Sequence, residues 1–207
     1  MQKQQVIVVH GGGSYAGIPR ETLVEELKNK EIDLERLRRK EDWKAELRFT
    51  LGDAYDVLYP TMPNRDLPLY AEWEALFDRV LDVVDTNIIL VGHSLGGMFL
   101  MKYFSEHTVQ KKVKGLFSVS APYNGEGDRW RFEKSNFIVG DDLSNIQRAD
   151  SVFLYHSHDD RVVPFSELEK YKEKLPDAVV RELDGRGHFN TKEFPEIVED
   201  IRGLGGL

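Results

Sequence analysis

Short apolar runs separated by longer amphipathic stretches set the pattern of this chain. Several of the runs are apolar throughout, as is typical of strands buried on both faces of a parallel sheet. Strands are predicted at residues 6–9, 55–60, 88–91, 113–120, 152–155 and 178–183. Helical periodicity, with apolar residues three or four positions apart, predicts helices over residues 43–49, 69–84, 98–107, 166–174 and 195–204. This alternation predicts an α/β fold with about six mainly parallel strands and helices on both faces.

Two segments fall outside the alternation, although residues 1–207 are still expected to form a single domain. Residues 20–40 form an amphipathic pattern that is broken near residues 29–30, with Asp33 available to cap a second helical piece. Residues 123–150 lack clear periodicity and contain three aromatic side chains other than tyrosine. A segment of that length between two strands is either functional, such as a lid, or a surface excursion held down by its aromatic residues.

Composition narrows the functional classes. The chain has 207 residues and a formal net charge of −8, which argues against nucleic acid or an anionic membrane as its main partner. It has no cysteine, which excludes a disulfide framework, a thiolate nucleophile and a zinc–thiolate site. The start is polar, and the apolar runs are too short for a signal peptide or a membrane span. We therefore expect a cytoplasmic protein.

The stretch 88–97 carries the clearest chemical signal. An apolar run leads directly into Gly92-His93-Ser94-Leu95-Gly96, and a helical pattern follows. A Gly-x-Ser-x-Gly sequence in that context is typical of a nucleophile elbow, a strained turn that exposes a serine hydroxyl. Glycines flank Ser94 because the chain doubles back too tightly for a side chain. Leu95 opens the helix, so its N–H is free to donate to an oxyanion. The alternative is an ordinary glycine-rich turn between a strand and a helix.

A second glycine-rich loop, His10-Gly11-Gly12-Gly13-Ser14, follows the predicted strand at residues 6–9. Consecutive glycines leave backbone N–H groups unshielded, and in an esterase such a loop supplies the second oxyanion donor. We assign that role to Gly12 first and to Gly13 second. A phosphate-binding loop is the alternative, but the Gly-x-Gly-x-x-Gly spacing and a Walker lysine are both missing.

A serine nucleophile needs a general base, and the base needs an acceptor that orients it. Asp159 and Asp160 follow the predicted strand at 152–155, and His188 follows the strand at 178–183. The carboxyl ends of parallel strands meet at one edge of a sheet, so Ser94, one of these aspartates and His188 are expected to converge there. Their order along the chain, Ser then Asp then His, is that of the α/β-hydrolase arrangement. The pattern alone does not separate Asp159 from Asp160.

The other histidines are expected to serve other purposes. His10 and His93 lie inside the glycine loops and are expected to brace them. His107 falls at a helix C-terminus, where a cation suits the helix dipole. His156 and His158 flank the acid loop, but no further well-spaced ligands accompany them, so no metal site is predicted.

Together these residues resemble the α/β-hydrolase superfamily, and within it the small serine hydrolases related to the retinoblastoma-binding hydrolase and the bacterial YdeN-type proteins. The resemblance covers nearly the whole chain. It rests on the glycine loop, residues 59–64 and 70–73, the elbow, Asp-Arg-Val-Val-Pro at 160–164 and Gly-His-Phe at 187–189. It implies serine-ester chemistry without a cofactor, and it implies Asp160 rather than Asp159 as the acid.

The chain departs from this family in two ways. Residues 20–40 resemble an insertion, which would allow a small helical cap near the pocket. The absence of cysteine removes the Leu-x-Cys-x-Glu pocket-binding motif, so retinoblastoma-type binding is not carried over.

We predict a serine hydrolase that cleaves a small carboxylic ester or related acyl compound through Ser94, His188 and Asp160. The expected partner is a small acyl substrate, with neither nucleic acid nor membrane. The alternatives are a non-catalytic binding or scaffold protein on the same fold, or a thioesterase or peptidase. Candidate pocket residues are Tyr15, Tyr123, Trp130, Phe132 and Phe137.

Overall fold

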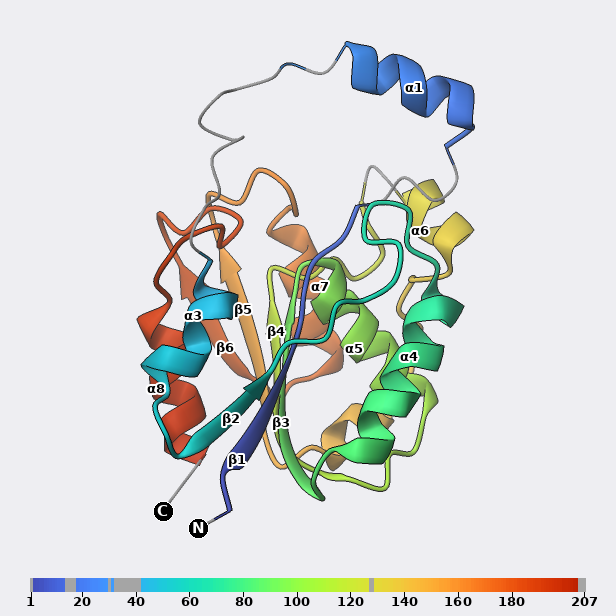
Figure 1. Ribbon diagram of the computed structural model, residues 1–207. Helices are drawn as coiled ribbons and strands as arrows, with labels where there is room; N and C mark the ends of the chain where they lie inside the picture. The colour runs from blue at the N-terminus through green and yellow to red at the C-terminus, as the bar shows by residue number, and fades with distance from the viewer. Residues whose placement is uncertain (1, 14–17, 30, 32–41, 127–128, 205–207) are drawn as a thin grey trace.

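The computed structural model describes residues 2–13, 18–29, 31, 42–126 and 129–204, except for the side chains of residues 129–131. Six parallel strands form one sheet in the order β2-β1-β3-β4-β5-β6 (Figure 1). The strands are β1 (Gln4–Val9), β2 (Tyr55–Leu58), β3 (Asn87–His93), β4 (Lys112–Val119), β5 (Val152–Ser157) and β6 (Val179–Leu183). From β1 the chain moves outward to β2, and from β3 it moves outward the other way to β4. Such a reversal leaves a crevice at the carboxyl ends of the two central strands.

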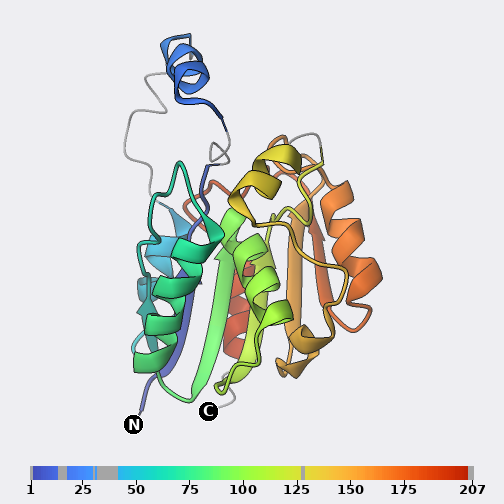
Figure 2. The same ribbon diagram turned by 90° about the vertical axis from the view of Figure 1, so that its right-hand side faces the viewer.

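Both faces of the sheet are covered, which explains why the central strands are apolar at every position. In β1, Val6 and Val8 belong to one hydrophobic cluster, whereas Ile7 and Val9 belong to the other. Successive side chains of a strand point to opposite faces, so each cluster fills one face. The helices α4 (Tyr70–Val83), α5 (Leu95–Glu106) and α7 (Ser166–Lys174) cover one face (Figure 2). The helices α3 (Trp43–Thr50) and α8 (Pro195–Leu204) cover the other (Figure 1).

The predicted fold class, a mainly parallel sheet with helices on both faces, is confirmed. The main predicted strands and helices agree with the observed bounds to within three residues. The largest shift is at α5, which begins at Leu95 itself, because the glycine-rich first turn gives no apolar periodicity.

The two segments outside the alternation behave differently from each other. Helix α1 (Arg20–Lys28) is capped by Asn29, where the break is predicted, and none of its residues is buried. It stands clear of the sheet on the side of the strands' carboxyl ends (Figure 1). The second helical piece predicted near Asp33 lies outside the described residues.

The segment 123–150 contributes to the core. It contains α6 (Arg129–Ser135) and the 3-10 helix η1 (Ser144–Arg148). Phe137 and Ile146 are fully buried in the cluster that α4 and α5 also fill. Much of this segment is therefore packed structure, although short helices of this size leave no periodic signal in the sequence. Within the described part of the chain, every helix falls short of the length and apolar character needed to cross a membrane.

Candidate active site

Ser94 lies at the sharp turn between β3 and α5, with φ 54° and ψ −123°. A positive φ is strained for a residue other than glycine and persists only where the surroundings enforce it. The N–H of Ser94 donates to the carbonyl of Val119 at 2.8 Å. Its own carbonyl accepts from the N–H groups of Gly97 at 2.9 Å and Met98 at 3.1 Å. The turn is thus fixed by β4 on one side and by the first turn of α5 on the other.

The glycines beside Ser94 are required by close backbone approach. A Cβ at Gly96 would lie 2.3 Å from the carbonyl oxygen of Val9 in β1. A Cβ at Gly92 would lie 2.5 Å from the carbonyl oxygen of Gly96. These distances are far below any real Cβ contact, so α5 can approach β1 and β3 only with glycine at both positions.

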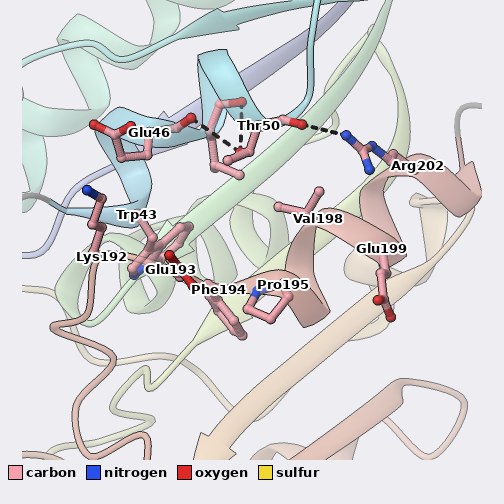
Figure 3. A pocket seen from close by; sticks show the side chains of 11 residues that line it. Trp43, Glu46, Thr50, Lys192, Glu193, Phe194, Pro195, Val198, Glu199 and Arg202 are labelled. Carbon is pink, nitrogen blue, oxygen red and sulfur yellow. Dashed lines mark hydrogen bonds between the residues drawn. The ribbon is translucent and has the colours of Figure 1, made fainter.

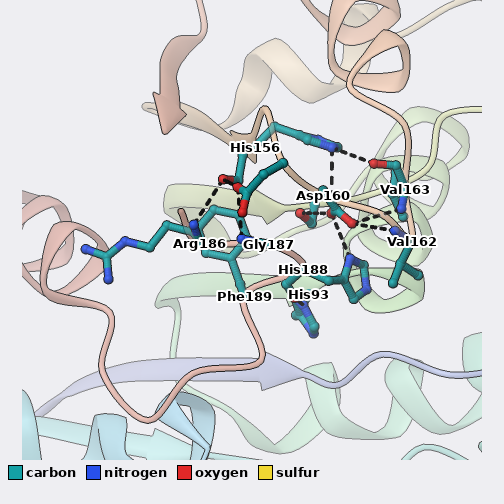
Figure 4. Close-up of polar contacts among 12 residues, drawn as sticks. His93, His156, Asp160, Val162, Val163, Arg186, Gly187, His188 and Phe189 are labelled. Atoms are coloured by element: carbon teal, nitrogen blue, oxygen red, sulfur yellow. Dashed lines mark hydrogen bonds and ion pairs between the residues drawn. The ribbon is translucent and has the colours of Figure 1, made fainter. Parts of the chain in front are cut away.

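Asp160 and His188 come together at the same end of the sheet (Figure 4). His188 Nδ1 lies 2.8 Å from Asp160 Oδ2. An ionised carboxylate only accepts hydrogen bonds, so Nδ1 carries the proton and Nε2 of a neutral His188 is left with a free lone pair. This is the tautomer in which His188 can accept a proton from a hydroxyl.

The Asp160 carboxylate is fully buried and satisfied on both oxygens. Oδ2 also accepts from Ser120 Oγ at 2.7 Å. Oδ1 accepts from the N–H groups of Val162 at 2.8 Å and Val163 at 3.0 Å. Burial acts to raise the pKa of Asp160, but the hydrogen bonds from His188, Ser120 and Val163 outweigh it and hold the pKa below 3.8. The group is therefore charged at neutral pH.

The loop that carries His188 is tied to the Ser94 turn through His93. His93 Nε2 lies 2.9 Å from the carbonyl oxygen of His188, and the two rings are 4.9 Å apart (Figure 4). Burial, reinforced by the charges of Lys44 and His188, holds the pKa of His93 well below 6.5. His93 is therefore neutral and donates its Nε2–H to that carbonyl. Because His93 precedes Ser94 in the chain, this bond fixes the position of the His188 backbone relative to the elbow.

Two further contacts hold the same loop. Trp43 Nε1–H donates to the carbonyl of Phe189 at 2.9 Å. Asp159 Oδ1 accepts from the N–H of Gly187 at 3.1 Å. The two adjacent aspartates therefore do different things: Asp160 faces the imidazole of His188, whereas Asp159 supports the backbone beside it.

The remaining histidines make structural contacts. His10 Nδ1–H donates to the carbonyl of Gly11 at 2.7 Å, and its Nε2 accepts from the N–H of Met62 at 2.9 Å. His156 Nε2–H donates to the carbonyl of Val163 at 3.0 Å. Burial lowers the pKa of both histidines, so both are neutral at neutral pH.

The two remaining histidines lie closer to solvent. His158 stacks on Phe165, and His107 Nε2 lies 2.7 Å from Glu74 Oε1. Among the described residues, no group of three or more His, Asp or Glu side chains is placed to hold a metal ion.

A cavity of about 130 Å³ lies against Ser94. Gly12 and Leu95 line it beside the serine, and Glu126 and Glu167 supply polar groups. The rest of the lining is mostly apolar and comes from Pro122, Phe132, Val162, Val163 and Pro164.

The predicted pocket residues divide into three groups. Phe132 lines the cavity. Tyr123 and Phe137 do not, and these two assignments are corrected: Phe137 is fully buried against Trp73, with ring centroids 5.2 Å apart. Tyr123 packs on Tyr171 and donates its hydroxyl proton to the carbonyl of Gly140 at 2.9 Å. Tyr15 and the side chain of Trp130 lie outside the described residues.

The two candidate loop glycines are also distinguished. Gly12 borders the cavity, and a Cβ there would lie 2.8 Å from both Leu95 Cδ2 and the carbonyl oxygen of Arg65. The N–H of Gly13 already donates to that same carbonyl of Arg65, at 2.8 Å.

Two residues at the site were not anticipated. Ser120, at the end of β4, holds Asp160, and a serine that ends a predicted buried strand was its only signal. Glu167 lies in the first turn of α7, and the sequence gives no sign that this glutamate is buried.

A larger cavity, of about 310 Å³, lies between α3 and α8 (Figure 3). Its lining includes Trp43, Leu47, Phe194 and Val198, with charged groups such as Glu46. No serine or histidine lines it, whereas Ser94 lines the smaller cavity.

Known proteins resemble this chain in sequence and in architecture. The sequence model of the serine hydrolase family matches residues 36–199. The rat serine hydrolase RBBP9 is 26% identical over 151 residues, which are 72% of this chain and 78% of that protein. The YdeN hydrolase of Bacillus subtilis is 24% identical over 151 residues, 73% of this chain and 78% of that protein.

The crystal structure of the B. subtilis ydeN product aligns with a TM-score of 0.75 at 19% identity, covering 99% of this chain and 100% of that one. An α/β-hydrolase enzyme from the sediment metagenome of a Moroccan lagoon aligns with a TM-score of 0.54 at 19% identity, covering 98% and 90%. These likenesses show the α/β-hydrolase fold. Because the family match extends over most of its length, this chain belongs to the serine hydrolase family.

Proposed function

We propose that this protein hydrolyses a small carboxylic ester through an acyl-enzyme formed on Ser94, with His188 as general base and Asp160 as the acid that orients it. The observation that carries the proposal is the 2.8 Å contact from His188 Nδ1 to a buried, ionised Asp160, on a loop fastened to the Ser94 turn. A serine hydroxyl is a poor nucleophile at neutral pH, and this arrangement supplies the base that it needs.

The reaction has two halves. Ser94 Oγ attacks the ester carbonyl carbon while His188 Nε2 takes the hydroxyl proton, and Asp160 stabilises the resulting imidazolium. The tetrahedral intermediate then breaks its bond to the leaving alcohol, which receives the proton from His188. In the second half, water gives a proton to His188 and attacks the acyl group. The carboxylic acid product then leaves as Ser94 regains its proton from His188.

The oxyanion is assigned to the backbone N–H groups of Leu95 and Gly12. Leu95 is the first residue of α5, and an N–H in the first turn has no acceptor within its helix. Gly12 is preferred to Gly13 because the Gly13 N–H is already bonded to Arg65. Each such donor is worth about 10²–10³ in turnover.

The size and chemistry of the cavity support a small acyl group. The lining side chains other than Ser94, Glu126 and Glu167 are apolar and favour a short hydrocarbon chain, because a charge buried against them would lose its hydration.

Covalent labelling and turnover test the proposal together. A fluorophosphonate probe is expected to modify Ser94 in the wild type, and p-nitrophenyl acetate is expected to be hydrolysed. Ser94→Ala should remove the labelling and lower turnover by up to about 10⁶-fold if chemistry limits the rate. Equal turnover in the wild type and Ser94→Ala, without labelling, would instead favour a scaffold protein that keeps the fold. A thioester or peptide panel run beside the esters identifies the preferred acyl compound.

A further inference from the structure

Glu167 is a buried glutamate that the proposed reaction does not use. It lies in the first turn of α7, and its side chain is 0% exposed. Oε2 accepts from the N–H groups of Tyr123 at 2.6 Å, Asn124 at 3.0 Å and Gly125 at 2.8 Å. Oε1 accepts from the N–H of residue 126 at 3.3 Å and from the ammonium of Lys170. One carboxylate thus gathers four consecutive backbone N–H groups.

These N–H groups need such a partner. Residues 121–126 follow β4 and belong to no strand or helix, so no ladder or helical turn satisfies them. A buried N–H without an acceptor is strongly unfavourable. Burial acts to raise the pKa of Glu167, but the hydrogen bonds from Lys170 and the backbone outweigh it and hold the pKa below 4.5. The carboxylate is therefore ionised and can accept all of these bonds at neutral pH.

The backbone turn at residues 122–126, which Glu167 holds through these hydrogen bonds, also forms one wall of the cavity beside Ser94. Pro122, Gly125 and Glu126 line that cavity, and so does Glu167 itself. Gly125 has φ 70°, and a Cβ there would lie 2.1 Å from the ring of Phe132. The Phe132 ring, which also lines the cavity, therefore rests directly on the turn. A shift of the turn would move both the backbone wall and this ring.

We infer that Glu167 is a positioning residue that fixes the 122–126 wall of the cavity and thereby sets the acyl chain length that the enzyme prefers. The effect on acyl chain length rests on the proposed esterase function. The fixing of the 122–126 wall rests on the hydrogen bonds alone. A displaced wall changes how well a given acyl group is held at the reacting geometry, and misplacement of about 1 Å can cost about 10²-fold in rate.

The primary test compares Glu167→Ala with Glu169→Ala over p-nitrophenyl esters of two to eight acyl carbons. Glu169 is a matched control, because it lies on the same helix and also pairs with a lysine three residues later, but is exposed. Glu167→Ala is expected to lose about 10²-fold in kcat/KM on the best wild-type ester and less on the others, which flattens the chain-length profile. Glu169→Ala should keep the wild-type profile.

Rescue by a small carboxylate sharpens the test. Glu167→Ala removes one methylene and one carboxylate, which acetate replaces almost atom for atom, and Glu167 borders the cavity. Sodium acetate should restore part of the wild-type profile in Glu167→Ala, whereas sodium chloride at equal ionic strength should not. If Glu167→Ala does not fold, Glu167→Gln serves, because its single carbonyl oxygen can replace only one of the two acceptor oxygens.

Two readouts separate the possible failures. If a folded Glu167 variant slows all esters by one common factor, or not at all, the inference is overturned. Amide hydrogen exchange at residues 123–126 measures the same wall without catalysis. It should accelerate at least tenfold in Glu167→Ala, and unchanged protection would also overturn the inference. A wild type that is neither labelled at Ser94 nor active on any ester refutes the proposed function instead, and the exchange result still decides the role of Glu167.

Discussion

Removal of the Ser120 hydroxyl is expected to weaken the anchoring of the Asp160 carboxylate without disturbing the rest of the fold. Ser120 is fully buried, and its Oγ donates to Asp160 Oδ2 at 2.7 Å. In Ser120→Ala, Oδ2 keeps His188 as its hydrogen-bond donor, and Oδ1 keeps the two N–H groups of residues 162 and 163. The carboxylate therefore stays ionised at neutral pH, but one of its charged hydrogen bonds is lost.

The magnitude follows from the chemistry of that bond. A hydrogen bond to a charged group contributes about 1.5–3 kcal/mol, so Ser120→Ala should lower the free energy of unfolding by about that amount at pH 7.5. Ser120 also has φ 46°, a conformation that costs a non-glycine residue about 1–2 kcal/mol. Ser120→Gly loses the same bond but relieves this strain. It is therefore expected to be about 1 kcal/mol more stable than Ser120→Ala, despite the flexibility that glycine adds to the unfolded chain.

In Ser120→Ala, the loss in kcat/KM, expressed as free energy, should be smaller than the loss in free energy of unfolding. Because Asp160 remains charged, it still stabilises the His188 imidazolium, and kcat/KM on a p-nitrophenyl ester should drop by about tenfold, which corresponds to about 1.4 kcal/mol. Urea unfolding at pH 7.5 gives the stability of all three proteins, and the ester assay gives their kinetics.

The stability difference between wild type and Ser120→Ala should also depend on pH, in a direction that can be checked. The Ser120 bond favours the charged form, so it lowers the folded-state pKa of Asp160, and its stabilisation is present above the ordinary pKa of 3.8. The stability difference between wild type and Ser120→Ala should therefore shrink as the pH falls below that value. A Ser120→Ala protein as stable and as active as the wild type at pH 7.5 would refute the assignment of Ser120 as the support of the acid.

Three further outcomes follow from the structure. Gly96→Ala places a methyl group against rigid β1 backbone and should lower the free energy of unfolding by about 3 kcal/mol, which is measured as a lower melting temperature. Gly203→Ala, where nothing lies within 4 Å of the added methyl group, should be neutral or slightly stabilising. Asp160→Asn should lower kcat by about 10⁴-fold, as loss of the orienting acid does in serine proteases, whereas Asp159→Asn, which keeps an acceptor oxygen for the Gly187 N–H, should stay within about tenfold of wild type. Burial lowers the folded-state pKa of the histidines at positions 10, 93 and 156, so below pH 6.5 the unfolded chain binds more protons than the folded one. Urea unfolding at pH 7.5, 6.5 and 5.5 should therefore show stability falling by up to about 1.4 kcal/mol per pH unit for each of them, and a flat profile would contradict their burial in the neutral form.

The features that the sequence predicts well are those with a local cause. A strand buried on both faces must be apolar at each position, so the central strands are readable directly from their runs. The elbow is readable because strand, glycines, serine and helix occur within one stretch. The convergence of the aspartate pair 159–160 with His188 follows because each comes just after a predicted strand, and parallel strands bring their ends together. Which of the two aspartates faces the histidine does not follow from this pattern.

The features that escape prediction depend on partners far along the chain. Ser120 meets a carboxylate 40 residues later, and Glu167 meets backbone 41 to 44 residues earlier. Gly12 and Gly13 are neighbours in one glycine run, and the Gly13 N–H is occupied by its hydrogen bond to a carbonyl in a distant loop. Phe132 and Phe137 lie in the same aperiodic segment, yet one faces the cavity and the other fills the core. Side chains of similar type are sorted by tertiary contacts, which local pattern does not encode.

The arrangement around Asp160 also explains how one carboxylate pairs with one histidine when two imidazoles are close to it. His156 Nε2 lies 3.7 Å from Asp160 Oδ2, little farther than His188 Nδ1 at 2.8 Å. His156 is held neutral by burial, and its Nε2–H is directed to the carbonyl of Val163, so it neither competes for the carboxylate nor adds charge beside it. Val163 also donates its own N–H to Asp160, so the backbone of one residue holds both the His156 imidazole and the Asp160 carboxylate. The negative charge of Asp160 is therefore left to stabilise a cation at His188, whose Nδ1 is hydrogen-bonded to it.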